Sequence, residues 1–317
     1  MSGIHTESLN LAEKQIRDYL SSENETNYKS KLNLFPSVIF GLDMAMRTLF
    51  NNLKKSNHNQ NFEIKEEIDT TFQTAGINCF KIPVNGLLIG SESMLELECK
   101  RLRDDGYQAI KIKVGQLTVK EDLKRVKIAR KILGDKIDLR LDANRLWEWD
   151  EALEFAKSVS EYGIQYCEEP LRDIRKIEKL YEETKVPFAL DETLWKNPNP
   201  ETLPKKGIKA FILKPCVLGG WDKTKFWIDF AEKKDIQVVL SSSFESGLGL
   251  NWIAFIAANL IKNQTPTGID TAKWFKHDLI DPPFVIKNGY YIIPEIWPKA
   301  KFNYLEQIDQ GTWVKPV

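Results

Sequence analysis

Apolar and polar residues follow two different patterns along the chain, and the change falls near residue 79. Before it, the stretches 8–20 and 36–55 carry apolar residues at helical spacing, and the second begins at Pro36. The stretch 54–71 is polar and is typical of a loop. We therefore expect residues 1–78 to be mainly helical, unlike the stretch that follows.

Eight short apolar runs rich in strand-forming residues come next, with amphipathic helical stretches such as 119–133 and 149–163 between them. The runs are 79–89, 109–115, 138–144, 164–170, 187–193, 208–215, 236–243 and 268–272. Strands that alternate with helices predict a parallel sheet, and eight such units over about 190 residues predict a (β/α)₈ TIM-type barrel. We place this α/β barrel at 79–280, and we expect two short strands outside it within 282–294.

Composition narrows the classes of function. The 317 residues contain 45 Lys and Arg against 45 Asp and Glu, so the formal net charge is zero and no basic surface for nucleic acid is indicated. No apolar run is long enough to cross a membrane, and the first residues do not resemble a signal peptide. The four widely spaced cysteines and three scattered histidines favour a reduced, cytoplasmic protein without histidine chemistry.

Charged residues stand at the ends of successive predicted strands. Lys113, Asp142, Glu168, Asp191 and Lys214 succeed one another at intervals of 23 to 29 residues, each about one βα unit. Because the carboxyl ends of all barrel strands meet at one mouth, we expect these five side chains to lie close together. Turn or helix-cap roles explain single residues of this kind, but not the ordered set.

Three carboxylates in a largely apolar mouth predict a bound cation, since their mutual repulsion and burial would otherwise raise their pKa values. Oxygen ligands without His or Cys favour Mg²⁺, with Mn²⁺ as the alternative. A lysine beside the metal and a second lysine should have a lowered pKa, so Lys113 could remove a proton next to a metal-bound carboxylate. The metal would hold the resulting enolate. Lys111, on the same face of its strand, would add positive charge.

Three further features have structural or functional interpretations. Glu169 and Glu192 come directly after the predicted ligands, so we expect their side chains to point away and to support the site. The stretch 241–247, SSSFESG, is either a plain loop or a helix N-terminus that binds an anion through backbone N–H groups. Cys167 and Cys216 lie in predicted strands and are interpreted as small core residues.

These motifs resemble the enolase superfamily in its muconate-lactonizing subgroup. The resemblance rests on KIKVG, LRLDANRLW, CEEPL, ALDETL and ILKPCVLGG, in this order. Within the subgroup, PSVIFGLDMA, LSSSFESGLGL and GIDTAKWF are most similar to the o-succinylbenzoate synthases, and the likeness covers about residues 33–290. It implies a Mg²⁺-dependent lyase that dehydrates 2-succinyl-6-hydroxy-2,4-cyclohexadiene-1-carboxylate to o-succinylbenzoate in menaquinone biosynthesis, through proton abstraction by lysine and a metal-stabilised enolate.

The resemblance also assigns roles. Asp142, Glu168 and Asp191 match the family's metal ligands. Lys113 matches the lysine that removes the α-proton and assists departure of the hydroxyl group. Lys214 matches the lysine on the opposite face, which stabilises the enolate.

The substrate-binding residues implied by the resemblance lie around these. Lys111 and Asn144 would contact the substrate or the groups near the metal. Ser241, Ser243 and Gly268 fall where family members hold the carboxylate groups of a small-molecule substrate.

The resemblance implies a small α+β capping domain as well. Its helical part would be 1–78 and its remainder 281–317, and it would be shortened at its N-terminus because the family's first antiparallel strands are not recognised in the sequence. Two alternatives stay open. A dipeptide epimerase or N-acylamino acid racemase would use the same lysines, but its usual Asp-x-Asp element stands here as Gly268 to Asp270. A homologue impaired or made non-catalytic by its short cap is the other.

Overall fold

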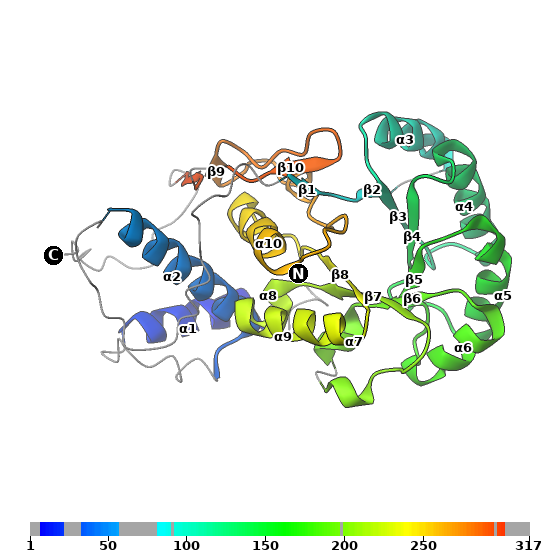
Figure 1. The fold of residues 1–317 in the computed structure, drawn as a ribbon, viewed down its shortest axis with the longest axis horizontal. Coiled ribbons are helices and arrows are strands. Elements are labelled where there is room, and N and C mark those ends of the chain that lie inside the picture. The colour runs from blue at the N-terminus through cyan, green and yellow to red at the C-terminus, as the bar shows by residue number, and fades with distance from the viewer. Residues whose placement is uncertain are drawn as a thin grey trace.

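A parallel sheet dominates the computed structural model, which describes residues 7–21, 33–56, 81–89, 92–196, 199–294 and 297–301. Seven strands pair in the order β2-β3-β4-β5-β6-β7-β8, every one with its neighbour in sequence. Figure 1 shows them as a curled sheet with helices on its outside. The strands are β2 Gly86–Leu88, β3 Ala109–Lys113, β4 Asp138–Asp142, β5 Tyr166–Glu168, β6 Phe188–Leu190, β7 Ile208–Leu213 and β8 Gln237–Leu240.

The eighth barrel position is filled by a very short segment. Gly268 forms a parallel bridge with Ser241 after β8, and Thr267 forms one with Val84 before β2. The Thr267–Gly268 segment therefore joins the two edges of the sheet, which confirms the predicted barrel. The expected strand at 268–272 is wrong in extent, because the chain turns after this point and forms a 3₁₀ turn at Ala272–Trp274.

Helices connect the strands and cover the sheet. They are α3 Glu92–Asp104, α4 Val119–Leu133, α5 Trp149–Val159, α6 Ile177–Thr184, α7 Glu192–Lys196, α8 Pro215–Leu218, α9 Gly220–Lys233 and α10 Gly247–Leu260. Short 3₁₀ turns lie at Ser160–Tyr162, Ile174–Lys176 and Pro200–Thr202. Helix α4 begins where the sequence predicts, because Thr118 and Glu121 form a reciprocal capping box at its N-terminus. No helix within the described ranges is long and apolar enough to cross a membrane.

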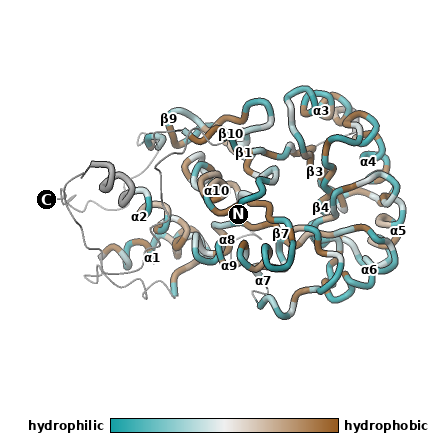
Figure 2. The backbone as a smooth tube through the Cα atoms, in the orientation of Figure 1, coloured by the Kyte–Doolittle hydropathy of each residue, from teal (hydrophilic) through white to brown (hydrophobic). Residues whose placement is uncertain are grey.

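The core lies between the sheet and the helices. On β3, Ile110 and Ile112 are fully buried against this layer, while Lys111 and Lys113 alternate with them on the other face. The apolar segments in Figure 2 accordingly follow the strands and the inner sides of the helices. Inside the barrel a smaller apolar cluster includes Tyr166 of β5. The alternation of β3 therefore points its lysines into the barrel.

Two further helices lie at the N-terminal end of the chain, α1 Leu9–Ser21 and α2 Pro36–Ser56. Helix α2 packs against α8 and α9 (Figure 1). Its buried Asp43 accepts a hydrogen bond from the backbone N–H of Trp221, at the start of α9, over 3.1 Å. The guanidinium of Arg47 lies 4.8 Å from the centre of the Trp221 ring. Both helices match the sequence prediction, whereas the division into a 1–78 cap, a 79–280 barrel and a 281–317 segment stays a prediction.

Two small antiparallel pairs stand outside the barrel sheet. Strand β1, Lys81–Pro83, pairs with β10, Tyr290–Ile292, and β9, Ile280–Asp281, pairs with β11, Lys299–Ala300. The predicted run 79–89 is thus divided between β1 and β2, and its first two residues lie outside the described ranges. Of the two strands expected within 282–294, β10 is present.

Candidate active site

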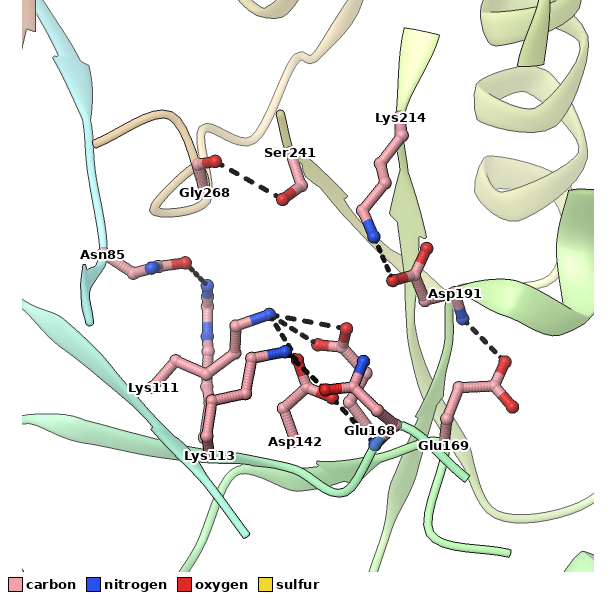
Figure 3. A network of polar contacts seen from close by, with 12 residues as sticks. Asn85, Lys111, Lys113, Asp142, Glu168, Glu169, Asp191, Lys214, Ser241 and Gly268 are labelled. Atoms are coloured by element: carbon pink, nitrogen blue, oxygen red, sulfur yellow. Dashed lines mark hydrogen bonds and ion pairs between the residues drawn. The ribbon is translucent and has the colours of Figure 1, made fainter. Parts of the chain in front are cut away.

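Two lysines on β3 reach the mouth of the barrel. The Nζ of Lys111 lies 2.9 Å from an Asp142 carboxylate oxygen and 3.2 Å from one of Glu168. The Nζ of Lys113 lies 2.6 Å from the same Asp142 oxygen and 2.6 Å from the Asn144 side-chain oxygen. Both amines therefore point at the carboxylates, as their spacing of two residues predicts (Figure 3).

The three predicted metal ligands stand on adjacent strands. Asp142 ends β4 and lies directly opposite Glu168, which ends β5, while Asp191 comes directly after β6. Each is at most 1% exposed. The sheet thus brings together three carboxylates that are far apart in sequence. Asp142 and Glu168 are in register, and Asp191 lies two residues beyond Ala189, the partner of Glu168, at the carboxyl end of the neighbouring strand.

Lys214 approaches this group from another side. It comes directly after β7, which stands four strands from β3 in the sheet order and hence across the barrel. Its Nζ lies 2.5 Å from Asp191 Oδ2. Figure 3 shows Lys214 on one side of the carboxylates, and Lys111 and Lys113 on the other. A small molecule seated between them would meet an amine on each face.

The charges in this cluster alter one another's titration. Burial disfavours the charged forms of Lys111 and Lys214, but the facing carboxylates outweigh burial and raise the pKa of each. Burial likewise opposes the Asp142 carboxylate, yet Lys111 and Lys113 lower its pKa. Burial and the Asp142 charge raise the pKa of Glu168 well above its usual range. In this arrangement the facing carboxylates therefore govern the titration of Lys111 and Lys214, and the lowered pKa expected of a lysine beside a bound cation stays a prediction.

Asn144 links the two sides of the site. Its side-chain oxygen accepts the Lys113 hydrogen bond, and its Nδ2 donates to Glu192 over 3.1 Å. Its backbone has a φ of 45°, in the left-handed region that Asn tolerates better than most residues. The sequence places Asn144 near the metal, and the structure adds that it contacts the predicted base.

Glu169 supports Asp191 from behind. Its carboxylate accepts hydrogen bonds from the Asp191 N–H at 2.9 Å, the Thr193 N–H at 2.7 Å and the Thr193 hydroxyl at 2.9 Å. Arg145 lies 3.7 Å away. Burial nevertheless raises the pKa of Glu169 to about 7. The supporting role expected for Glu169 agrees with these contacts, whereas the sequence analysis missed Thr193, whose only signal is its position two residues after Asp191.

The predicted substrate-binding residues differ in the hydrogen bonds that they already make within the chain. Ser241 Oγ donates to the Gly268 carbonyl at 3.3 Å, and a Cβ on Gly268 would lie 2.5 Å from that Oγ, so both line a tight edge of the mouth. Ser243 instead donates its N–H and its hydroxyl to the carboxylate of Glu245, over 2.8 Å and 2.5 Å. Ser243 is thus bound to its own chain here.

One contact of α10 bears on the anion-binding interpretation of SSSFESG. The first N–H of this helix, from Gly247, donates to Asp278 Oδ1 over 3.0 Å. An aspartate of the chain itself therefore already binds one N–H group of this helix N-terminus, and anion binding there stays a prediction. Cys167 and Cys216 are free and buried, which agrees with their interpretation as core residues. The strand expected for Cys216 is wrong, because this residue lies in α8, whereas Cys167 lies in β5.

The carboxylates suit a hard divalent cation in chemistry, although the present geometry pairs them with lysines. Within the part of the chain that the structure describes, no three His, Cys, Asp or Glu side chains are arranged to hold a metal. Asp191 Oδ1 is nevertheless buried without a hydrogen-bond partner. An orphaned carboxylate oxygen beside two further buried carboxylates fits Mg²⁺, which prefers oxygen ligands. Binding it would require the ammonium groups to withdraw from these oxygens.

Comparison with known proteins assigns the chain to a family. A model of the family described as Enolase C-terminal domain-like matches residues 94–297, which hold β3 to β8 and all five charged strand-end residues. The chain belongs to this enolase family. The prediction of enolase-superfamily membership is thereby confirmed.

Individual relatives differ in how much of them the chain covers. The o-succinylbenzoate synthase of Pasteurella multocida (strain Pm70) is 28% identical over 291 residues, which are 88% of this chain and 78% of that enzyme. Protein PHYLLO, chloroplastic, of Arabidopsis thaliana is 29% identical over 273 residues, 78% of this chain but 16% of that protein. The chain therefore spans only a small part of the latter.

A solved structure repeats the architecture. The L-Ala-D/L-Glu epimerase of Bacillus subtilis superposes with a TM-score of 0.75 and covers 94% of this chain and 83% of its own. The two chains are 20% identical, so this likeness concerns the fold.

Proposed function

We propose that the chain is a Mg²⁺-dependent hydro-lyase that converts 2-succinyl-6-hydroxy-2,4-cyclohexadiene-1-carboxylate to o-succinylbenzoate, a reaction of menaquinone biosynthesis. The observation that carries the proposal is the placement of Lys113 and Lys214 on opposite sides of three buried carboxylates. The relative from P. multocida, which bears the name of this activity, supports the choice of reaction.

Lys113 is the proposed base. Its neutral amine would take the proton from the carbon next to the substrate's ring carboxylate, and the electron pair of that C–H bond would form the new C=C bond. The C–O bond of the ring hydroxyl would break on the same face of the ring. Lys113 would give the abstracted proton to the leaving oxygen, which departs as water. The products balance as o-succinylbenzoate and one water molecule.

Asp142, Glu168 and Asp191 would hold the Mg²⁺, which when bound supplies positive charge at the substrate carboxylate. Lys214 would stabilise the negative charge that develops on the face opposite to the base. Lys111, Asn144 and the edge formed by Ser241 and Gly268 would orient the substrate, while Ser243 would first have to leave Glu245. Formation of an aromatic ring provides driving force, so little more is required of the protein.

An epimerase or racemase is the second candidate, favoured by the structural likeness to the B. subtilis epimerase. Two features of the mouth argue against this second candidate. Position 268 carries no acidic side chain, and one there would first have to displace Ser241 Oγ, which would lie 2.5 Å from its Cβ. The Asp270 carboxylate is already bound by the Lys273 Nζ at 2.6 Å and the Tyr107 hydroxyl at 3.1 Å. Both contacts fall on Asp270 Oδ2, so a substrate ammonium group would find no carboxylate at position 268 and would compete with Lys273 and Tyr107 at position 270.

The experiment offers the purified chain with Mg²⁺ two substrates in parallel. The cyclohexadiene acid is followed by ultraviolet absorbance of the aromatic product, and L-Ala-L-Glu is followed by deuterium incorporation from heavy water at the α-carbon. We expect dehydration to exceed epimerisation by orders of magnitude. Exchange of the dipeptide without dehydration would establish the epimerase instead. Silence with both substrates would overturn the proposal in favour of a non-catalytic homologue.

A further inference from the structure

Helix α4 places two charged side chains in the protein core, outside the site described above. Its buried stripe consists of Asp122, Arg125, Val126, Ala129 and Leu133. Asp122 is 0% exposed and Arg125 is 6% exposed. Apolar residues would fill these two positions at lower cost, because a buried ion pair regains its desolvation penalty only through good geometry.

Both side chains bind the main chain at the end of β3. Asp122 Oδ2 accepts a hydrogen bond from the Gly115 N–H over 2.6 Å. Arg125 Nη1 donates to the Lys113 carbonyl over 2.8 Å and to Asp122 Oδ1 over 3.0 Å. The pair therefore holds the main chain at Lys113 and Gly115, the two residues that flank Val114. Lys113 is the residue whose side chain is the proposed base.

The sheet explains why this carbonyl needs a partner from a helix. Strand β2 ends at Leu88, opposite Ile112, so it has no residue level with Lys113. On the other side, the Val114 N–H donates to the Asp142 carbonyl over 2.9 Å. Gly115 has a φ of +86°, and a Cβ there would lie 3.1 Å from Leu146 Cβ. The segment is thus fixed between β4 and α4.

We propose that Asp122 and Arg125 are positioning residues, which hold the backbone of Lys113 so that its amine meets the reacting proton. The part of this proposal that concerns catalysis rests on the proposed function. The contact with the Lys113 main chain does not. A displacement of about 1 Å at a base can cost about 100-fold in rate, so a helix that fixes this backbone has direct catalytic consequences.

The test compares two substitutions on α4. Arg125→Met removes both Nη1 hydrogen bonds. Arg130→Met is the matched control. Arg130 lies in the last turn of the same helix, and it also donates to main-chain carbonyls, those of Tyr162 and Gly163. For each variant we would measure the melting temperature, kcat and KM for the cyclohexadiene substrate, and the rate at which acetic anhydride labels Lys113 relative to Lys111, read by mass spectrometry.

Both variants should melt at lower temperature, but only Arg125→Met should lose about 100-fold in kcat with KM within about twofold. Its Lys113 should also be labelled at a changed rate, while the Arg130→Met ratio equals that of the wild type. Arg125→Lys should restore much of kcat, because a single nitrogen makes both contacts. It also serves if the methionine variant does not fold.

Two results would overturn the positioning role. One is kcat for Arg125→Met within about twofold of that for Arg130→Met. The other is a Lys113 labelling ratio that Arg125→Met and Arg125→Lys both leave unchanged. A wild type without turnover would refute the proposed reaction alone, because the labelling ratio still decides whether α4 controls the geometry of Lys113.

Discussion

Glu168→Gln is expected to stabilise the metal-free protein while impairing its response to Mg²⁺. The substitution removes one negative charge from the buried carboxylates and keeps the shape of the side chain. Burial, and then the charge of Asp142, raise the pKa of Glu168 well above its usual range. A carboxyl group whose pKa is raised on folding costs stability when it is ionised at neutral pH, and the neutral amide removes this cost.

The gain should be on the order of 1 kcal/mol, the size commonly recovered when an unfavourable feature of a functional site is removed. For a chain of 317 residues that corresponds to about 1.5 °C in melting temperature, because the unfolding entropy is about 2.1 cal/mol/K per residue. Saturation with Mg²⁺ should reverse the order, because a ligand at 100 times its Kd stabilises the wild type by about 2.7 kcal/mol. The variant, which has lost one of three acidic ligands, should respond far less. Thermal unfolding in EDTA and in a Mg²⁺ series measures both effects.

A suitable control is Glu154→Gln, which removes an exposed carboxylate from α5. It should leave both the melting temperature in EDTA and the Mg²⁺ response unchanged. The reasoning is refuted if Glu168→Gln melts below the wild type in EDTA. Equal Mg²⁺-induced shifts in the two proteins would show instead that Glu168 is not a ligand.

Four further substitutions test other parts of the account. Gly268→Ala should lower the free energy of unfolding by about 1–3 kcal/mol in urea titrations, because its Cβ would lie 2.5 Å from Ser241 Oγ. Gly41→Ala in helix α2, where a Cβ would meet open space, should instead raise the free energy of unfolding by up to about 1 kcal/mol. A change of the same sign in both variants would contradict the packing argument. Asp43→Ala should cost about 1–2 kcal/mol by the same titration, since this residue caps α9, and no loss would deny α2 that anchoring role. Lys214→Met should lower kcat at least about 100-fold while Mg²⁺ still raises the melting temperature, and unchanged kcat would exclude its electrostatic role.

Much of the barrel could be predicted from sequence because its strands and helices are encoded locally. In the run 109–115, the alternation of apolar residues and lysines predicts both the strand and its inward face. In the run 138–144, the charged Asp142 at the end of the apolar stretch does the same. The predicted eighth strand is too long, since Thr267 and Gly268 are held by bridges to distant partners rather than by a long apolar run. The split of 79–89 between two sheets likewise depends on the pairing of β1 with β10.

The meeting of Lys113, Asp142, Glu168, Asp191 and Lys214 was predictable for a geometric reason. Parallel strands of a barrel bring their carboxyl ends to one mouth, so the spacing of about one βα unit was sufficient.

The contacts that the sequence analysis did not foresee depend on tertiary packing. The capping of α10 by Asp278 depends on how distant loops pack. Asp122 and Arg125 left one signal, namely charges on the buried stripe of an amphipathic helix, but their partners are main-chain atoms at the end of β3. Such contacts are set by tertiary geometry rather than by local pattern.

The most direct test of the central claim is the rate at which the purified chain forms the aromatic product from the cyclohexadiene acid in Mg²⁺, measured beside the same protein in EDTA and beside Lys113→Ala. The account predicts steady turnover in Mg²⁺ that is abolished by EDTA and by Lys113→Ala. Turnover that survives either treatment would contradict a metal-dependent reaction with Lys113 as its base.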